Sequence, residues 1–171
     1  MKVGKYTTVA LLLVAAINLY FLITVRICDF NGTNWQTIIY SDGKGYYEYL
    51  QAAFINHNLD HQDSTLGFIR ITKQGPAIKF FVGPAIAYAP FFTVAYVQAR
   101  FRDQAIDGYS IEFQRMIALA GWFYCLLGLF FTAKLLRIFN IHDGVVALTL
   151  LVITYGTNLF YYAVLEPAMS P

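Results

Sequence analysis

The sequence predicts an all-α membrane protein, a helical bundle with about three transmembrane helices and amphipathic juxtamembrane helices on the outer side. Of the 171 residues, 58% are hydrophobic and 13% are charged, whereas a soluble domain is about 45–50% apolar and about 25% charged. The apolar residues gather in runs long enough to cross a bilayer. The net charge of +2 and the lack of a basic run argue against a nucleic-acid partner. We therefore expect one membrane domain over residues 1–171, with membrane lipids as neighbours.

The first transmembrane helix is predicted over residues 7–27. Its apolar run is longer than the core of a signal peptide, and no small-x-small cleavage site follows it, which favours an uncleaved anchor. Lys2 and Lys5 precede the run and Arg26 closes it. These lysines place the N-terminus in the cytoplasm and the next segment outside, in an inner or plasma membrane and hence in the cell envelope.

Residues 28–113 are expected to form an outer loop with juxtamembrane helices. Between Lys44 and Phe54, apolar residues recur at the i, i+3, i+4 and i+7 spacing of a helix that lies on a surface, namely Tyr46, Tyr49, Leu50 and Ala53. Ser41 or Asp42 is the expected N-cap of this helix. The loose alternation from Phe68 to Lys73 predicts a short extended piece.

The stretch from Phe80 to Phe101 leaves two topologies open. It is apolar, but Pro84 and Pro90 are expected to break or kink a helix near its start. If this stretch crosses the membrane, the chain has four spans and Glu166 is cytoplasmic. If it lies in the outer interface, the chain has three spans and Glu166 lies on the same side as Asp42.

Charges in the later loops favour three spans. The remaining transmembrane helices are predicted over residues 114–136 and 144–165, with Lys134 and Arg137 near the short loop that joins them. Positive charges in short loops mark the cytoplasmic side, and the rule is weaker for a segment as long as 28–113.

Polar residues within these helices are expected to face other helices or a cavity rather than lipid; they are Asn18, Thr154, Thr157 and Asn158. Cys28 and Cys125 are expected to be free thiols. Because the chain stops at Pro171 with these faces unshielded, we expect an N-terminal part of a larger bundle, completed by further transmembrane segments or a partner subunit.

Four residues are candidates for chemistry. Asp42, just outside the first span, is a candidate general base for an acceptor hydroxyl, and its alternative role is helix capping. Glu166 is a second candidate catalytic acid, or else an interfacial charge at a helix end. Arg115 and Lys79 are candidate ligands of a lipid phosphate, and the alternative for Arg115 is an interfacial anchor.

The histidines suggest a metal site only weakly. His57 and His61 have i, i+4 spacing with Asp60 and Asp63 beside them, which suits a divalent metal on a helix. The surrounding loop is polar throughout, which favours a solvated loop. No cofactor is therefore predicted with certainty.

The order of these features resembles the N-terminal part of the GT-C superfamily of integral-membrane glycosyltransferases. The likeness extends over nearly the whole chain and is closest to protein O-mannosyltransferases and to the aminoarabinose transferases that modify lipid A. It rests on short motifs in a particular order: Ser41-Asp42-Gly43 with Tyr46-Tyr47, Gly83-Pro84-Ala85-Ile86-Ala87-Tyr88, Arg115 at the head of a span, and Tyr162-Ala163-Val164-Leu165-Glu166-Pro167.

The resemblance implies transfer of a sugar, with inversion, from a polyprenyl-phosphate donor to an unidentified acceptor hydroxyl on the outer face. Asp42 matches the aspartate that acts on the acceptor, Glu166 an acidic position at an outer helix end, and Arg115 the arginine that begins the second span. It also implies that Gly83 to Phe101 is an outer juxtamembrane helix. The chain departs from the family at Val82-Gly83, where relatives often have an acid or Lys, and at Gly43, where a second acid is common. Both departures weaken the case for a metal.

A non-catalytic membrane subunit or a transporter component is the alternative class. It would use polar residues of the spans as a packing or permeation face, namely Asn18, Thr157, Asn158 and Glu166. Transporters commonly show inverted repeats or paired broken helices, and the sequence shows neither.

Overall fold

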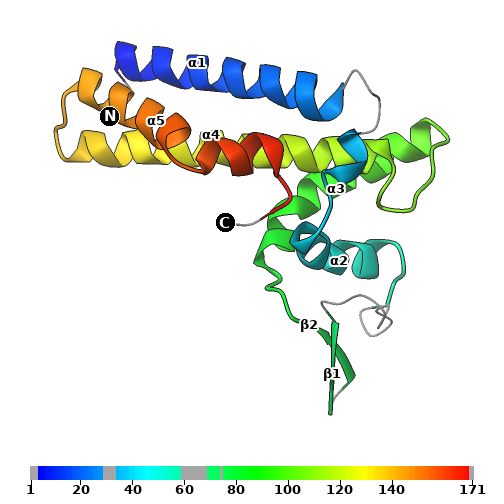
Figure 1. The fold of residues 1–171 in the computed structure, drawn as a ribbon. Coiled ribbons are helices and arrows are strands. Elements are labelled where there is room, and N and C mark those ends of the chain that lie inside the picture. Colours follow the sequence, from blue (N-terminus) through cyan, green and yellow to red (C-terminus); the bar gives the residue numbers. More distant parts are fainter. Residues whose placement is uncertain (1–3, 29–33, 59–68, 74, 170–171) are drawn as a thin grey trace.

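The computed structural model describes residues 4–28, 34–58, 69–73 and 75–169, and it is mostly helical (Figure 1). In chain order the elements are α1 (Lys5–Phe21), the π-helical η1 (Leu22–Ile27), the 3-10 turn η2 (Asn34–Thr37), α2 (Asp42–Phe54), β1 (Ile69–Thr72), β2 (Gly75–Ile78), α3 (Gly83–Phe101), α4 (Ile111–Ile138), α5 (Asp143–Gly156) and the π-helical η3 (Tyr161–Leu165).

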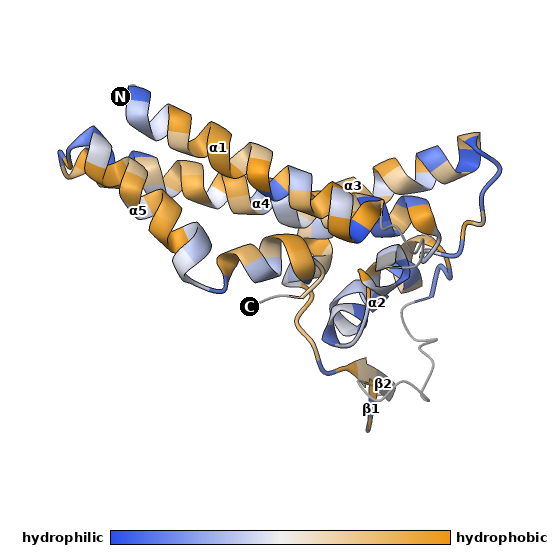
Figure 2. Ribbon diagram, turned by 45° about the horizontal axis from the view of Figure 1, so that its top comes forward, coloured by the Kyte–Doolittle hydropathy of each residue, from blue (hydrophilic) through white to orange (hydrophobic). Residues whose placement is uncertain are grey.

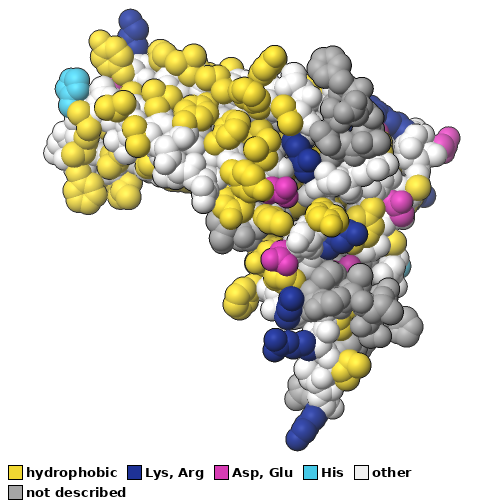
Figure 3. Space-filling view, in the orientation of Figure 1, with side chains coloured by type: hydrophobic (Ala, Val, Ile, Leu, Met, Phe, Trp, Pro, Cys, Tyr) yellow, Lys and Arg dark blue, Asp and Glu magenta, His cyan; other side chains and the backbone are white. Residues whose placement is uncertain are grey.

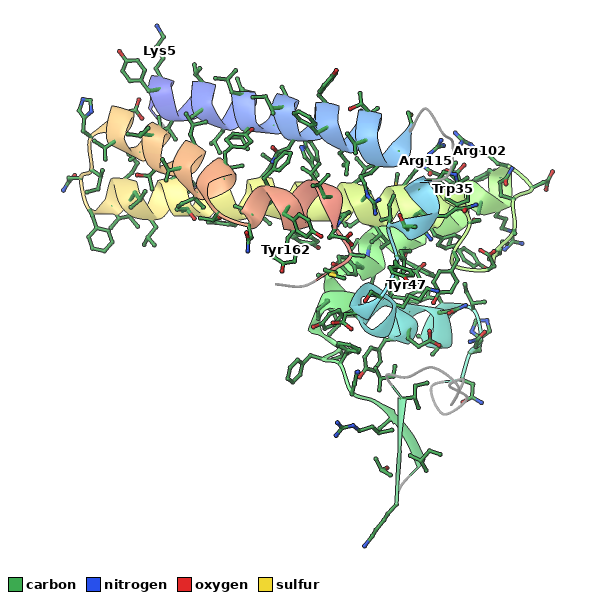
Figure 4. All side chains as sticks on the ribbon, viewed as in Figure 1. Lys5, Trp35, Tyr47, Arg102, Arg115 and Tyr162 are labelled. Carbon is green, nitrogen blue, oxygen red and sulfur yellow. The ribbon has the colours of Figure 1, made fainter. Side chains whose placement is uncertain are left out.

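Three helical segments lie side by side as an elongated rod: α1 with η1, α4, and α5 with η3 (Figures 1 and 2). One end, here called the proximal end, is closed by hydrogen bonds from Tyr6 N (2.8 Å) and Thr7 Oγ1 (2.6 Å) to the carboxylate of Asp143. The opposite, distal end holds η2 and the ends of η1 and η3. Figure 4 shows Lys5 at the proximal end and Arg115 toward the distal end.

The rod combines a small apolar core with a broad apolar surface. Val14, Ile117 and Leu150 are fully buried between its helices. All three helices are rich in hydrophobic residues (Figure 2), and hydrophobic side chains cover much of their surface (Figure 3). The exposed large apolar residues include Leu12, Tyr20, Phe131, Leu148 and Val152. Within the described residues, α1 with η1 and α4 are long and apolar enough to cross a membrane, whereas α5 is a shorter apolar helix.

The predicted single helix over 144–165 is wrong, because α5 ends at Gly156. Thr157 has an extended backbone (φ −126°, ψ −179°), and η3 begins only at Tyr161. The Thr157 hydroxyl accepts from Leu159 N (3.2 Å) and donates to Ile153 O (2.6 Å), which replaces hydrogen bonds of a continuous helix. Gly and β-branched Thr are weak helix formers, so the break falls where local helix propensity is lowest.

Helices α2 and α3 and the β1–β2 hairpin lie beside the distal half of the rod (Figures 1 and 2). The antiparallel hairpin pairs Ile69 with Ile78. It confirms the extended piece expected near 68–73, with Phe68 outside the described residues, and departs from an all-α fold. The face that α2 buries differs in part from the predicted stripe: Leu50 is buried as predicted, but Tyr47 is buried too and Ala53 is exposed. The reason is that α2 packs on α3 rather than only on a flat surface.

Helix α3 lies antiparallel along the first half of α4. Its start is held by a hydrogen bond from Tyr124 Oη to Ala87 O (2.8 Å), and its end by the ion pair Arg102–Glu112 (2.8 Å). Pro84 lies in the first turn, where a missing N–H costs nothing. Pro90 lies inside the helix without ending it, so of the two expected effects, a break or a kink, the break does not occur.

Candidate functional site

Asp42 is the exposed first residue of α2, with no side-chain cap at this helix start. Ser41 occupies the N-cap position with φ 49°, and its hydroxyl does not bond the helix. In the described part of the chain, Asp42 forms neither a hydrogen bond nor an ion pair. The alternative role of Asp42, capping the start of α2 with its side chain, is therefore not supported. What remains is an unpaired carboxylate at the positive end of a helix dipole.

The turn after η3 packs directly against the start of α2. A Cβ added to Gly43 would lie 3.0 Å from Ala168 Cβ and 3.1 Å from Ala168 O. The same turn rests on α4, because a Cβ on Gly121 would lie 2.7 Å from Pro167 Cβ. Both glycines permit a backbone approach that a side chain would block. Asp42 and Glu166 are thus within two residues of one backbone contact.

Glu166 is half-buried and interacts electrostatically with Arg26 at the end of η1. Arg26 is only 8% exposed. Its guanidinium donates to Thr37 Oγ1 (3.0 Å) and to Thr37 O (2.8 Å). Sequence reasoning assigned Arg26 only to the boundary of the first span. The only sequence signal for this contact is that Arg26 ends the first apolar run and Glu166 ends the last one.

Arg115 lies one turn into α4, and its Nε is buried without a hydrogen-bond partner in the described structure. The neighbouring Gln114 accepts from Ile39 N (2.7 Å) and donates to Tyr109 O (3.3 Å). Figure 4 shows Arg115 near Trp35 and Arg102, away from Tyr162. An unsatisfied buried guanidinium nitrogen is costly, and an anion would relieve this cost.

Lys79 lies next to Phe80, which packs on α2 rather than on α4. It is exposed, and its amine lies 5.1 Å from the centre of the Phe80 ring. Phe80 in turn stacks on Tyr46 (4.7 Å between ring centres) and accepts a hydrogen bond from Tyr49 Oη (2.8 Å). The two predicted phosphate ligands therefore lie on different parts of the fold: Lys79 beside α2, and Arg115 in α4.

A mainly apolar pocket of about 310 Å³ opens beside Pro167, between α3, α4 and η3. The hydroxyl-bearing residues of its lining are Tyr88, Tyr124 and Tyr162. Tyr88 Oη donates to Pro167 O (3.2 Å). Burial, with smaller effects from Tyr46 and Tyr124, raises the pKa of Tyr88 to about 12, so this donor stays protonated at neutral pH.

Helix α2 contains a buried acid, Glu48, that the sequence did not reveal. Glu48 is 4% exposed and accepts from Tyr109 Oη (3.5 Å). Burial, followed by the charge of Glu48, raises the pKa of Tyr109 well above its usual value. Glu48 was hidden in the sequence because the predicted stripe placed it on the outward face of α2.

The described residues contain no cluster of three or more metal-ligating side chains. His57 is exposed, and Asp60, His61 and Asp63 lie outside the described residues. Cys28 and Cys125 are free thiols, as predicted.

Of the polar residues in the spans, Asn18 and Thr154 are buried, as expected. Asn18 Oδ1 accepts from Tyr155 Oη (3.3 Å). Thr157 and Asn158 are exposed on the surface of the described residues, and their contact with a further helix or a cavity stays a prediction.

No family model, curated protein or solved structure matches this chain. The resemblance to GT-C enzymes stays a prediction from the order of the sequence motifs.

Proposed function

We propose that this chain is the N-terminal membrane part of a glycosyltransferase that moves a sugar from a polyprenyl-phosphate donor to an acceptor hydroxyl on the outer face. The observation that carries the proposal is the contact of Gly43 with Ala168. It brings the unpaired Asp42 to the helix end that bears Glu166. Two acids from segments far apart in the sequence thus share one corner of the molecule beside a pocket.

The spacing of charges along the rod supports three membrane crossings. No charged residue lies between Lys5 and Arg26 or between Arg115 and Lys134. At about 1.5 Å per residue these stretches rise about 32 Å and about 29 Å, close to the hydrocarbon thickness of about 30 Å. The broken α5–η3 segment is likewise uncharged between Asp143 and Glu166. It begins against Tyr6 at the proximal end and its last part, η3, packs against η1.

The surface of the rod also favours lipid as its surroundings. Only 22% of the most apolar stretch of α1–η1 and 33% of that of α4 is buried within the chain. A core helix of a soluble protein would be mostly buried. Because large apolar side chains remain exposed on all three helices, a hydrocarbon environment accounts for this surface.

The proximal end is proposed to face the cytoplasm. It holds Lys5 next to the short loop between α4 and α5, which is flanked by Lys134 and Arg137. Positive charges in short loops lie on the cytoplasmic side. The distal end, with Asp42 and Glu166, then faces outward, and α3 packs on the outer half of α4 without crossing.

In the proposed reaction, Asp42 accepts the proton of an acceptor hydroxyl while that oxygen attacks the anomeric carbon of the sugar. The bond from this carbon to the phosphate oxygen breaks, and the lipid phosphate leaves with the electron pair and inversion at carbon. Arg115 stabilises the leaving phosphate through its unpaired guanidinium edge, and Lys79 is a second, peripheral cation. Glu166, beside Arg26, is proposed to orient the acceptor.

The test is sugar transfer in membrane vesicles by the full-length protein of which this chain is the proposed N-terminal part, using a panel of labelled polyprenyl-phosphate sugars. The exchange Asp42→Asn should reduce transfer by at least about 100-fold, the usual contribution of a general base. Asp103→Asn, at an exposed acid of the same outer segment, should leave transfer unchanged. Equal transfer by D42N and wild type, or no transfer of any donor by wild type, would contradict the proposal.

One observation keeps a non-catalytic membrane component as a second candidate. The break at Thr157 makes the third helix discontinuous, and discontinuous helices are common at transporter binding sites. In that case Thr157→Val and Asn158→Leu should alter solute flux into vesicles, while D42N should not.

A further inference from the structure

An exposed surface with basic and apolar side chains lies on the β1–β2 hairpin and the segment that leads into α3. We call it the hairpin surface. Its basic residues are Arg70, Lys73 and Lys79, and its apolar residues are Ile71 (81% exposed), Phe81 (82%) and Ile86 (67%). Figure 3 shows Lys and Arg side chains along this projection.

Among the described residues, no acid forms an ion pair with the cations of the hairpin surface. The described residues between 69 and 82 include no Asp or Glu. None of the three cations forms an ion pair with a described residue, and Lys79 only touches the ring of Phe80. Such a surface is complementary to a layer of negative charge.

The hairpin surface lies at the expected depth of the outer membrane boundary. The first turns of α3 are tied to α4 near Gly121 and Tyr124, through the Tyr124–Ala87 hydrogen bond and the packing of Pro167 on Gly121. The hairpin surface is also joined to α2 through the packing of Phe80 on Tyr46. Helix α2 contacts Ala168, two residues after Glu166, which interacts with Arg26 at the outer end of the first crossing. In Figures 1 and 2 the hairpin points sideways from the rod, and therefore along the plane of a membrane that the rod crosses.

An apolar groove lies next to these cations. It encloses about 650 Å³ between α2, β2 and α3, and Phe54, Ile78, Val82 and Ile86 are among its lining residues. Lys79 directly follows Ile78, and Arg70 pairs with Ala77 across the hairpin. A cationic rim over an apolar groove suits a molecule with an anionic head and an acyl tail.

We propose that the hairpin surface docks on anionic phospholipids of the outer leaflet. The cations contact headgroup phosphates, Phe81 and Ile86 enter the acyl region, and the groove holds part of an acyl chain. The docked hairpin would restrict the motion of α2, and therefore of Asp42, at the membrane surface. This inference rests on the membrane crossing of the proposed function, and not on the catalytic role of Asp42.

The experiment places a fluorescent probe at Gly83→Cys in a C28S/C125A background. Gly83 has open space at its Cβ position and lies next to the hairpin surface. The full chain is reconstituted in nanodiscs of phosphatidylcholine with increasing phosphatidylglycerol, and quenching by lipid-bound nitroxides is measured. We expect quenching to rise with phosphatidylglycerol and to fall in high salt. R70Q/K73Q/K79Q should lower the apparent affinity for phosphatidylglycerol about fivefold per cation.

Two matched variants separate docking from general perturbation. Phe81→Ala should reduce quenching. Phe101→Ala, at an equally exposed phenylalanine (87%) near the Arg102–Glu112 ion pair, should not. Equal quenching in neutral and anionic nanodiscs, or no effect of the triple variant, would overturn the docking proposal. Extraction of the chain by alkaline carbonate would instead overturn the membrane crossing itself, while inactivity of the enzyme would leave docking intact.

Discussion

Asp143 and Asp42 are two carboxylates in the same local position at opposite ends of the molecule. Each is the first residue of a helix, α5 and α2 respectively. Asp143 accepts from Tyr6 N and Thr7 Oγ1 and thereby joins two helices of the rod. Asp42 has no such partner in the described structure.

The difference separates a carboxylate that holds the fold together from one that is available for chemistry. A hydrogen-bonded carboxylate contributes to stability, because its replacement leaves its donors without their acceptor, here the exposed Tyr6 N and the part-buried Thr7 hydroxyl. An unpaired carboxylate contributes little to stability and is available for chemistry. At the proximal end, the hydrogen bonds of Asp143 hold two helices together. At the distal end, Arg26 and Arg115 each have a buried Nε without a partner in the described structure.

The largest stability effect is expected at the proximal end. Asp143→Ala removes the acceptor for both Tyr6 N and Thr7 Oγ1, and should lower the thermal unfolding temperature in detergent by several degrees. Thr7→Val should have a smaller effect in the same direction. Asp42→Ala should leave the unfolding temperature unchanged. If D42A were as destabilising as D143A, the comparison would fail.

A second variant tests whether the distal end has a structural contact of its own. Arg26→Gln removes two charge-assisted hydrogen bonds to Thr37 and should cost about 2 kcal/mol of unfolding free energy. Arg100→Gln, at an exposed arginine near the end of α3, is the control and should change stability little. Chemical denaturation in detergent measures both, and an R26Q variant as stable as R100Q would refute the anchoring role.

The packing of the last turn on α4 predicts stability changes of opposite sign in two matched variants. Gly121→Ala places a Cβ 2.7 Å from Pro167 Cβ and should cost about 1–3 kcal/mol. Gly128→Ala lies in the same helix with open space at its Cβ and should stabilise by about 0.5–1 kcal/mol. Thermal unfolding of both variants compares them, and equal shifts would show that the close approach is absent.

The helices of the rod could be predicted because long uncharged runs require only composition and length. The break at Thr157 could not, since a few weak helix formers in an apolar run give a faint local signal. The buried face of α2 was mispredicted because it depends on contacts with Phe92 and Tyr109, which come from later segments. For the candidate site, the sequence indicated Asp42, Glu166, Arg115 and Lys79. The interaction of Arg26 with Glu166 needed the three-dimensional packing of η1 against η3.

The central claim is that three crossings bring Asp42 and Glu166 to one face of the membrane. It is tested most directly by labelling single cysteines with an impermeant maleimide in intact cells, in a C28S/C125A background. Ser41→Cys, Gln104→Cys and Met169→Cys should react from outside, whereas Phe139→Cys should react only after the membrane is permeabilised. Protection of Gln104→Cys and Met169→Cys together with outside labelling of Phe139→Cys would show that α3 crosses the membrane. That result would separate the two acids and contradict the account.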